Sequence, residues 1–264
     1  MIDVRAFDRR RYATLGTALQ SLEAIAEYPL GNDHFRIDHG DAYFRFFERL
    51  GEPRFHVAMD GQRIVGCAAG VLRRVPRGAG TVRAWYLCDL KVHPDYRRQG
   101  IPARLFRKGL LPNYFRCGRA YAISMNPPDG ENPVVRVTER LPFFPIGKLA
   151  ELRFYSLDAD AAAATMQAIA EIVGPCSWLS LQGTKDLILR STGGPLRLLH
   201  LQHGPLAEPG AVRPEAGALH MVCAPEGSRL ATLLDARFAC SATASVIGYR
   251  VQRTGWEFVL TSDI

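Results

Sequence analysis

The stretch LCDLKVHPDYRRQGIPARLFRKGL, residues 87 to 110, joins a strand pattern to a helix pattern through a short basic turn. The turn contains one glycine, Gly100, and two arginines, Arg97 and Arg98. A helix N-terminus exposes backbone N–H groups that its own turns cannot satisfy, and the helix dipole adds partial positive charge there. The stretch therefore predicts a phosphate-binding loop at the start of a helix.

Pro102 lies inside this loop and has no backbone N–H to offer a phosphate. Proline nevertheless suits the first turn of a helix, because its fixed φ is already helical and the missing donor would be unpaired there anyway. We expect the loss of one hydrogen bond to phosphate, on the order of 1 kcal/mol, and arginines 97, 98 and 104 to offset it.

Around this stretch, the first 157 residues predict the element order β-α-α-β-β-β-α-β-α-β. RFHVAMDGQRIVGCAAGVLRRV predicts a hairpin with its turn at Asp60-Gly61. YPLGNDHFRIDHG predicts a loop, and Asp41 is expected to cap the helix in DAYFRFFERLG. Antiparallel strands followed by a βαβ crossover predict an α+β fold with a mixed, mostly antiparallel sheet.

We expect two domains, residues 1–157 and a smaller, β-rich domain over residues 158–264. One internal echo links them: MNPPDGEN…VTERLPFF resembles CAPEGSRLATLLDARF, a strand, a turn with proline and glycine, and a short helix. The second half lacks a counterpart of the arginine-rich turn. Two interpretations of residues 158–264 stay open, a degenerate duplicate of the first domain and an unrelated β-rich domain.

Charge is distributed unevenly along the chain. Residues 1–150 hold 24 Lys and Arg against 15 Asp and Glu, and the remainder holds 9 against 11. A basic half suits a polyphosphate ligand, nucleic acid or an ordinary solvated surface. The six cysteines are scattered without metal-ligand spacing, and no apolar stretch is long enough to span a membrane. We expect a cytoplasmic protein with no metal site and no membrane partner.

The run L-x-V-x-P-x-x-R-x-x-G, built from residues 90, 92, 94, 97 and 100, resembles the acetyl-CoA signature of the GNAT acetyltransferase superfamily. The element order of residues 1–157 resembles that family too. Two departures stand out. Pro102 occupies the place of a final Gly or Ala, and Thr138 occupies the place of a tyrosine that often protonates the leaving thiolate.

The resemblance implies an N-acyltransferase that moves an acetyl or other acyl group from CoA directly to a primary amine. It implies that the backbone of Leu90, Lys91 and Val92 binds the pantetheine arm, with the Val92 N–H polarising the thioester carbonyl. Asn126 would flank the other side. The residues expected to hold the pyrophosphate are Arg97, Arg98, Gln99, Gly100, Ile101, Pro102 and Ala103.

Asp89 is our candidate for the catalytic base, because the family often carries a carboxylate immediately before this strand segment. A structural ion pair with Lys91 or an arginine, and simple solvation, are the competing interpretations of Asp89. The resemblance places the acceptor wall between the first two helices, where Tyr28, Asp33 and Phe35 combine carboxylate with aromatic faces. That combination suits a small-molecule or peptide amine, and a capped helix with packed aromatics is the alternative.

Three other functions compete with acetyl transfer. The basic half could bind nucleic acid, but its charges are not interleaved with aromatic residues and no recognition helix stands out, so we expect no nucleic-acid partner. The departures at Pro102 and Thr138 would also suit a catalytically inactive CoA-binding sensor or interaction protein. The third alternative is an enzyme that uses a longer acyl-CoA. The sequence leaves the oligomeric state open, a homodimer included.

Overall fold

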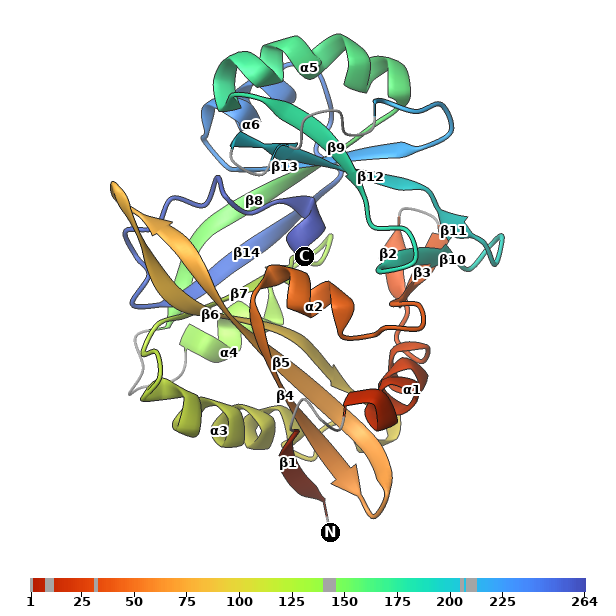
Figure 1. Ribbon diagram of the computed structural model, residues 1–264, viewed down its shortest axis with the longest axis vertical. Coiled ribbons are helices and arrows are strands. Elements are labelled where there is room, and N and C mark those ends of the chain that lie inside the picture. Colours follow the sequence, from red (N-terminus) through yellow and green to blue (C-terminus); the bar gives the residue numbers. More distant parts are fainter. Residues whose placement is uncertain (1, 8–11, 31–32, 140–145, 205–206, 208–212) are drawn as a thin grey trace. The chain divides into compact units, whose positions relative to one another are not determined.

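The computed structural model describes residues 2–7, 12–30, 33–139, 146–204, 207 and 213–264 (Figure 1). Contacts divide the chain into two compact units. The first holds Met1–Val75, Thr81–Tyr121 and Gly183–Pro195, and the second holds Pro76–Gly80, Ala122–Gln182 and Leu196–Ile264. The expected domains, 1–157 and 158–264, are each one continuous segment, whereas each compact unit combines several segments. The expected division stays a prediction.

The first unit is built on four neighbouring strands. In sheet order they are β1 (Asp3–Phe7), β4 (Glu52–Asp60), β5 (Arg63–Arg77) and β6 (Gly80–Val92). β1 and β5 both pair antiparallel with β4, and the β4–β5 hairpin turns at Asp60 and Gly61 as predicted. Gly61 has a φ of 59°, the left-handed conformation that such a turn requires.

The helices of the first unit bury apolar faces on these strands. α3 (Ile101–Tyr114) packs on β1 and β4, and Ile101 and Leu105 are buried with Val4, Ala58 and Val65. α2 (Arg45–Leu50) packs on β4 through its phenylalanines. Its N-cap is Phe44, without a side-chain cap bond, so the prediction that Asp41 caps this helix was wrong. α1 (Tyr12–Glu23) is the remaining helix described in this unit.

The segment predicted as a loop after α1 forms strands instead. β2 (Tyr28–Leu30) and β3 (Asp33–Asp38) pair antiparallel, and β10 (Asp186–Leu189) pairs antiparallel with β3. The loop was predicted because glycine, asparagine and aspartate favour turns. Pairing of β3 with β10, about 150 residues later in the chain, overrides this local preference. β11 (Pro195–Leu196) follows β10 in the chain and neighbours it in this small sheet.

The second unit is a mixed sheet covered by helices. Its strands are β7 (Ala120–Met125, from residue 122 on), β8 (Gly147–Leu157), β9 (Cys176–Ser180), β12 (Leu198–His203), β13 (Leu219–Pro225) and β14 (Ala242–Tyr249). β12 and β13 are parallel, whereas β8 pairs antiparallel with both β13 and β14. The helices α5 (Ala159–Val173) and α6 (Arg229–Asp235) pack together over the end formed by β9, β12 and β13 (Figure 1). The predicted α+β class with a mixed sheet is therefore confirmed.

The internal echo corresponds to two similar substructures in this unit. β7 leads through α4 (Pro133–Glu139) to β8, and β13 leads through α6 to β14. The sheet order β7-β14-β8-β13 places the last strand of each substructure beside the first strand of the other. Each substructure is thus completed by a strand from the other half of the sequence.

The segment that follows β14 does not form a strand, although apolar residues recur along it. WEFVLTSDI, at residues 256–264, carries no strand and ends in a buried 3-10 helix, η4 (Thr261–Asp263). Trp256 and residues 259–263 are buried, and η4 packs against β12 and β13 without pairing as a strand.

Candidate active site

The phosphate loop, Arg97–Ala103, follows a single 3-10 turn, η2 (Pro94–Tyr96), and leads directly into α3. Gly100 is the N-cap of α3 with a φ of 69°, and Arg98 is also left-handed with a φ of 64°. The first helical bond of α3 runs from the Arg104 N–H to the Gly100 carbonyl. Within the described residues, the N–H groups of residues 98–101 and 103 have no acceptor, so they are available to an anion.

Pro102 occupies the second position of α3, where its missing N–H removes one of the open donors of the first turn. A Cβ added to Gly100 would meet no atom within 4 Å, so the space above the loop is open. Arg97 and Arg98 are exposed beside it. Arg104 was expected to add its charge to the loop, but its guanidinium donates to the backbone carbonyl of Ile2 instead.

The strand before the loop is irregular at Asp89, whose φ of 56° is unusual for a residue with a side chain. Leu90, the next residue, is 54% exposed, a large exposed fraction for an apolar side chain on a strand. A Cβ on Gly66 of β5 would lie 3.1 Å from the Lys91 carbonyl and 3.0 Å from the Ile101 side chain. Only glycine allows β5, β6 and α3 to approach this closely.

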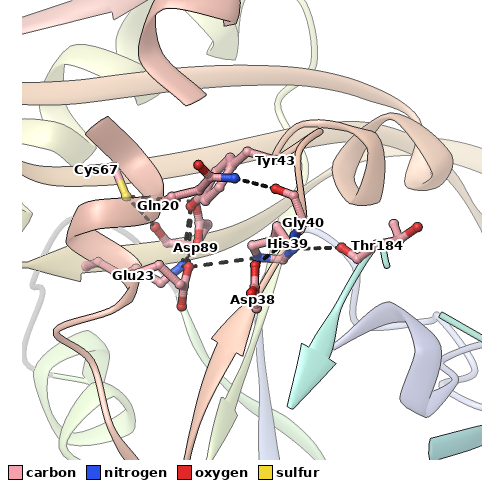
Figure 2. A network of polar contacts seen from close by, with 10 residues as sticks. Gln20, Glu23, Asp38, His39, Gly40, Tyr43, Cys67, Asp89 and Thr184 are labelled. Carbon is pink, nitrogen blue, oxygen red and sulfur yellow. Dashed lines mark hydrogen bonds and ion pairs between the residues drawn. The ribbon is translucent and has the colours of Figure 1, made fainter. Parts of the chain in front are cut away.

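Asp89 is buried in a network of polar contacts (Figure 2). Its Oδ1 accepts a hydrogen bond from the Lys91 ammonium, and its Oδ2 accepts one from the Tyr43 hydroxyl at 2.7 Å. The Cys67 thiol lies 3.8 Å from Oδ2. The side chain of Asp89 is 3% exposed, so the structural ion pair with Lys91 that competed with a catalytic role is present.

Glu23, the last residue of α1, is the second carboxylate of this network. Its Oε2 pairs with the Lys91 ammonium and lies 3.5 Å from the Tyr43 hydroxyl. Burial raises the pKa of Glu23, and the Lys91 charge opposes that shift. Burial alone would lower the pKa of Lys91, but the two carboxylates outweigh it and raise that pKa, so Lys91 stays charged.

His39 connects this network to the segment 183–195. Its Nδ1 lies 3.1 Å from the Thr184 carbonyl, which can only accept, so Nδ1 carries the proton and Nε2 the lone pair. Nε2 lies 3.8 Å from Glu23 Oε2 (Figure 2). Burial lowers the pKa of His39 to about 4, so the ring is neutral at pH 7.

The segment 183–195 is built into the first unit along its whole length. β10 pairs with β3, and the backbones approach so closely that a Cβ on Gly40 would lie 2.5 Å from the Gly183 carbonyl. Beyond β10, the Ser191 hydroxyl donates to Asp33 Oδ2 at 2.5 Å. Lys185 directs its ammonium over the Phe46 ring, 4.7 Å from the ring centroid. The C-terminal half thus supplies part of the expected acceptor wall.

The three expected acceptor residues lie in different surroundings. Tyr28 and Phe35 stack with centroids 5.4 Å apart on β2 and β3. Burial raises the pKa of Tyr28 to about 12, and the charges of Lys91 and Glu23 also act on it, so Tyr28 lies near the buried network. Asp33 points elsewhere, toward Ser191, at the far end of β3.

Asn126 lies in the second unit, directly after β7. Its Nδ2 donates to the Thr243 hydroxyl at 2.8 Å, and its Oδ1 accepts from Asn132 at 2.9 Å and Ser245 at 2.7 Å. These bonds occupy the amide, so its expected contact with CoA stays a prediction. The Thr138 hydroxyl bonds to the Val135 carbonyl at 2.8 Å, and residues 140–145 lie outside the described part of the chain.

Sequence reasoning missed Glu23, His39 and Lys185 as parts of this site. Nothing local distinguishes Glu23 from the other polar residues of an amphipathic helix, and Lys185 lies in the half of the chain without a recognised motif. Within the described ranges, no group of three or more His, Cys, Asp or Glu side chains could hold a metal ion. The same part of the chain contains no helix with the length and apolar character to cross a membrane.

Part of the chain is similar to a known protein family. Residues 19–135 match the Acetyltransferase (GNAT) family, whereas no curated protein matches the sequence significantly. The tandem GNAT protein from the clavulanic acid biosynthesis pathway aligns at 13% identity with a TM-score of 0.52, over 94% of this chain and 98% of its own. This alignment supports a shared tandem fold and says nothing of a shared substrate.

Two further solved structures align less closely. A GCN5-related N-acetyltransferase from Kribbella flavida aligns with 94% of this chain and 71% of its own at 12% identity and a TM-score of 0.46. An acetyltransferase from Trypanosoma brucei aligns with 54% of this chain and 92% of its own at 18% identity and a TM-score of 0.36.

Proposed function

We propose that the protein is an acyl-CoA-dependent N-acyltransferase, on the premise that residues 19–135 match the Acetyltransferase (GNAT) family. The observation that carries the proposal is the phosphate loop. Its free N–H groups, its open space above Gly100 and its exposed Arg97 and Arg98 fit a pyrophosphate. The co-substrate is acetyl-CoA or another acyl-CoA, which supplies the thioester.

The strand before the loop binds the reacting end. The backbone of Leu90, Lys91 and Val92 lies along the pantetheine arm, and the exposed Leu90 side chain gives that arm an apolar surface. The Val92 N–H polarises the thioester carbonyl as negative charge develops on its oxygen.

The acceptor is a primary amine, which is protonated at neutral pH and must lose a proton before it attacks. The neutral nitrogen forms a bond to the thioester carbon, and the carbon–sulfur bond breaks. Of the two protons that the nitrogen loses, one ends on the CoA sulfur and the other leaves through the carboxylates of Asp89 and Glu23. Asp89 is the proton acceptor on the CoA-binding strand, and Lys91 pairs with both carboxylates.

The state of the cysteines supports a cytoplasmic location. All six cysteines are free, and five of them are held in hydrogen bonds or packed positions that do not bring two thiols together. Free thiols are typical of a reducing compartment.

A thiol-release assay tests the proposed function. The protein is mixed with acetyl-CoA, succinyl-CoA or a long-chain acyl-CoA and with amines, amino acids, aminoglycosides and peptides, and free CoA is measured. We expect CoA release that depends on both substrates, with the acylated amine identified by mass. CoA binding without acyl transfer to any amine would instead support the inactive sensor.

A further inference from the structure

The first observation is an unpartnered carboxylate oxygen in the buried network. Glu23 is 2% exposed, and its Oε2 takes the contacts with Lys91 and His39. Its Oε1 is buried without a hydrogen-bond partner among the described residues. A buried carboxylate oxygen without a partner destabilises the folded protein, so such an atom suggests a ligand that completes its bonding. An ammonium group is the complementary ligand.

The second observation is an ammonium group without a carboxylate. Lys185 rests over the Phe46 ring and forms no ion pair within the part of the chain that the structure describes. Burial, followed by the Lys91 charge, lowers the pKa of Lys185 to about 8. A carboxylate ligand would stabilise the charged form of Lys185.

Contacts of His39 link the two groups within the first unit. Its Nε2 lies 3.8 Å from Glu23 Oε2, its Nδ1 bonds to the carbonyl of Thr184, the residue before Lys185, and its ring centroid lies 5.5 Å from that of Phe46, the ring under the Lys185 ammonium. The charges of Glu23 and Lys185 act on each other. Among the described residues they nevertheless form no ion pair with each other, so each charge is available to a ligand.

We propose that Glu23 and Lys185 bind the two ends of a zwitterionic acceptor, so that the substrate is an α-amino acid. Glu23 Oε1 receives its ammonium group and Lys185 its carboxylate. The inference rests on the proposed function, because it names the acceptor of the same reaction. A simple amine would satisfy Glu23 and leave Lys185 unpaired, which makes the α-carboxylate the determinant of specificity.

The direct test compares acceptors that differ only in the carboxylate. Each L-amino acid is assayed with acetyl-CoA against its carboxamide and against the amine that lacks the carboxyl carbon. We expect kcat/KM for the preferred amino acid to exceed that of both analogues by about tenfold or more, the effect of one lost charged contact. Equal or faster turnover of the carboxamide would overturn the inference while leaving the N-acyltransferase intact.

Variants then assign the effect to Lys185. Lys185→Met is expected to lower kcat/KM about tenfold for the amino acid and to leave the carboxamide unchanged, with Lys185→Arg retaining most of the preference. Arg190→Gln is the control, because Arg190 lies in the same segment and pairs with Glu27 on the surface. An equal loss for acid and amide in Lys185→Met would show a merely structural role and contradict the assignment.

Equilibrium binding separates failure of the inference from failure of the proposed function. If no amine is acylated, the proposed function fails, and calorimetry with the amino acids alone decides the inference. Binding that is lost in Lys185→Met and kept in Arg190→Gln supports the zwitterion site. The absence of binding by any amino acid overturns it.

Discussion

The Tyr43 hydroxyl donates a hydrogen bond to Asp89 Oδ2 over 2.7 Å and thereby fixes the carboxylate that precedes Leu90 on β6. Asp89 Oδ1 is held by Lys91, so both oxygens of the expected base are engaged. Among the residues that the structure describes, Glu23 Oε1 has no hydrogen-bond partner. Because the two carboxylates differ in this way, we assign proton transfer to Asp89 and Glu23 together and not to Asp89 alone.

Tyr43→Phe removes one donor from this network without changing the shape of the ring. We expect a loss of about 1–3 kcal/mol in the free energy of unfolding, because a buried carboxylate oxygen loses its partner. Urea unfolding gives the value, and Tyr96→Phe is the control, since its hydroxyl bonds to Asp60 over 2.9 Å near the surface. Similar losses in both variants would contradict a special role for the buried bond.

His39 predicts a pH dependence of stability. The ordinary pKa of histidine is 6.5, and burial lowers that of His39 to about 4, so the folded protein binds fewer protons than the unfolded chain between these values. Stability contributed by neutral His39 is present above pH 6.5 and is lost as the pH falls toward 4. The difference is on the order of 3 kcal/mol.

The measurement is the free energy of unfolding at pH 7 and pH 4.5 in wild type, His39→Asn and His34→Asn. His34 is an exposed histidine on β3 and serves as the control. We expect the acid-induced loss to shrink in His39→Asn alone. The same loss in His39→Asn as in wild type would show that other groups cause it.

Pro102→Ala restores one N–H to the phosphate loop. We expect CoA to bind about fivefold more tightly, which corresponds to a hydrogen bond of about 1 kcal/mol. Pro112→Ala is the control, because Pro112 lies exposed inside the same helix but far from its N-terminus. Unchanged affinity in Pro102→Ala, measured by calorimetry, would mean that this position does not face the phosphates.

The exchange of strands in the second unit predicts that residues 1–157 do not form a native sheet alone. β14 lies between β7 and β8, so the shortened chain exposes strand edges that β14 covers in the full chain. We expect a fragment of residues 1–157 to lose fixed tertiary packing, seen as a lost near-UV circular dichroism signal, and to regain it when residues 158–264 are added. A cooperatively folding fragment would contradict this dependence.

The features that the sequence could predict are those fixed by local patterns. The Asp60-Gly61 turn, the basic loop with Gly100 and the strands on either side of it depend on residues close together in the chain. The buried network does not. His39 contacts Thr184, which lies 145 positions later in the chain, and Lys185 from the same later segment contacts the Phe46 ring.

The β2–β3 pair and β14 illustrate the same limit. Glycine and aspartate at residues 31–40 favour a loop, and only pairing with β10 makes a strand of Asp33–Asp38. The position of β14 between β7 and β8 depends on which strand edges the rest of the chain leaves open. Propensity identifies elements, whereas tertiary contacts decide their neighbours.

Calorimetry with acetyl-CoA on wild type, Gly100→Trp and Gly227→Trp tests the central claim that the phosphate loop holds CoA. Gly227 is the matched control, because it too has a positive φ and open space and lies in the turn before another helix, α6. We predict binding by wild type and Gly227→Trp and a loss of at least about a hundredfold in Gly100→Trp, where a side chain fills the phosphate site. Unchanged binding in Gly100→Trp, or no binding by wild type, would contradict the account.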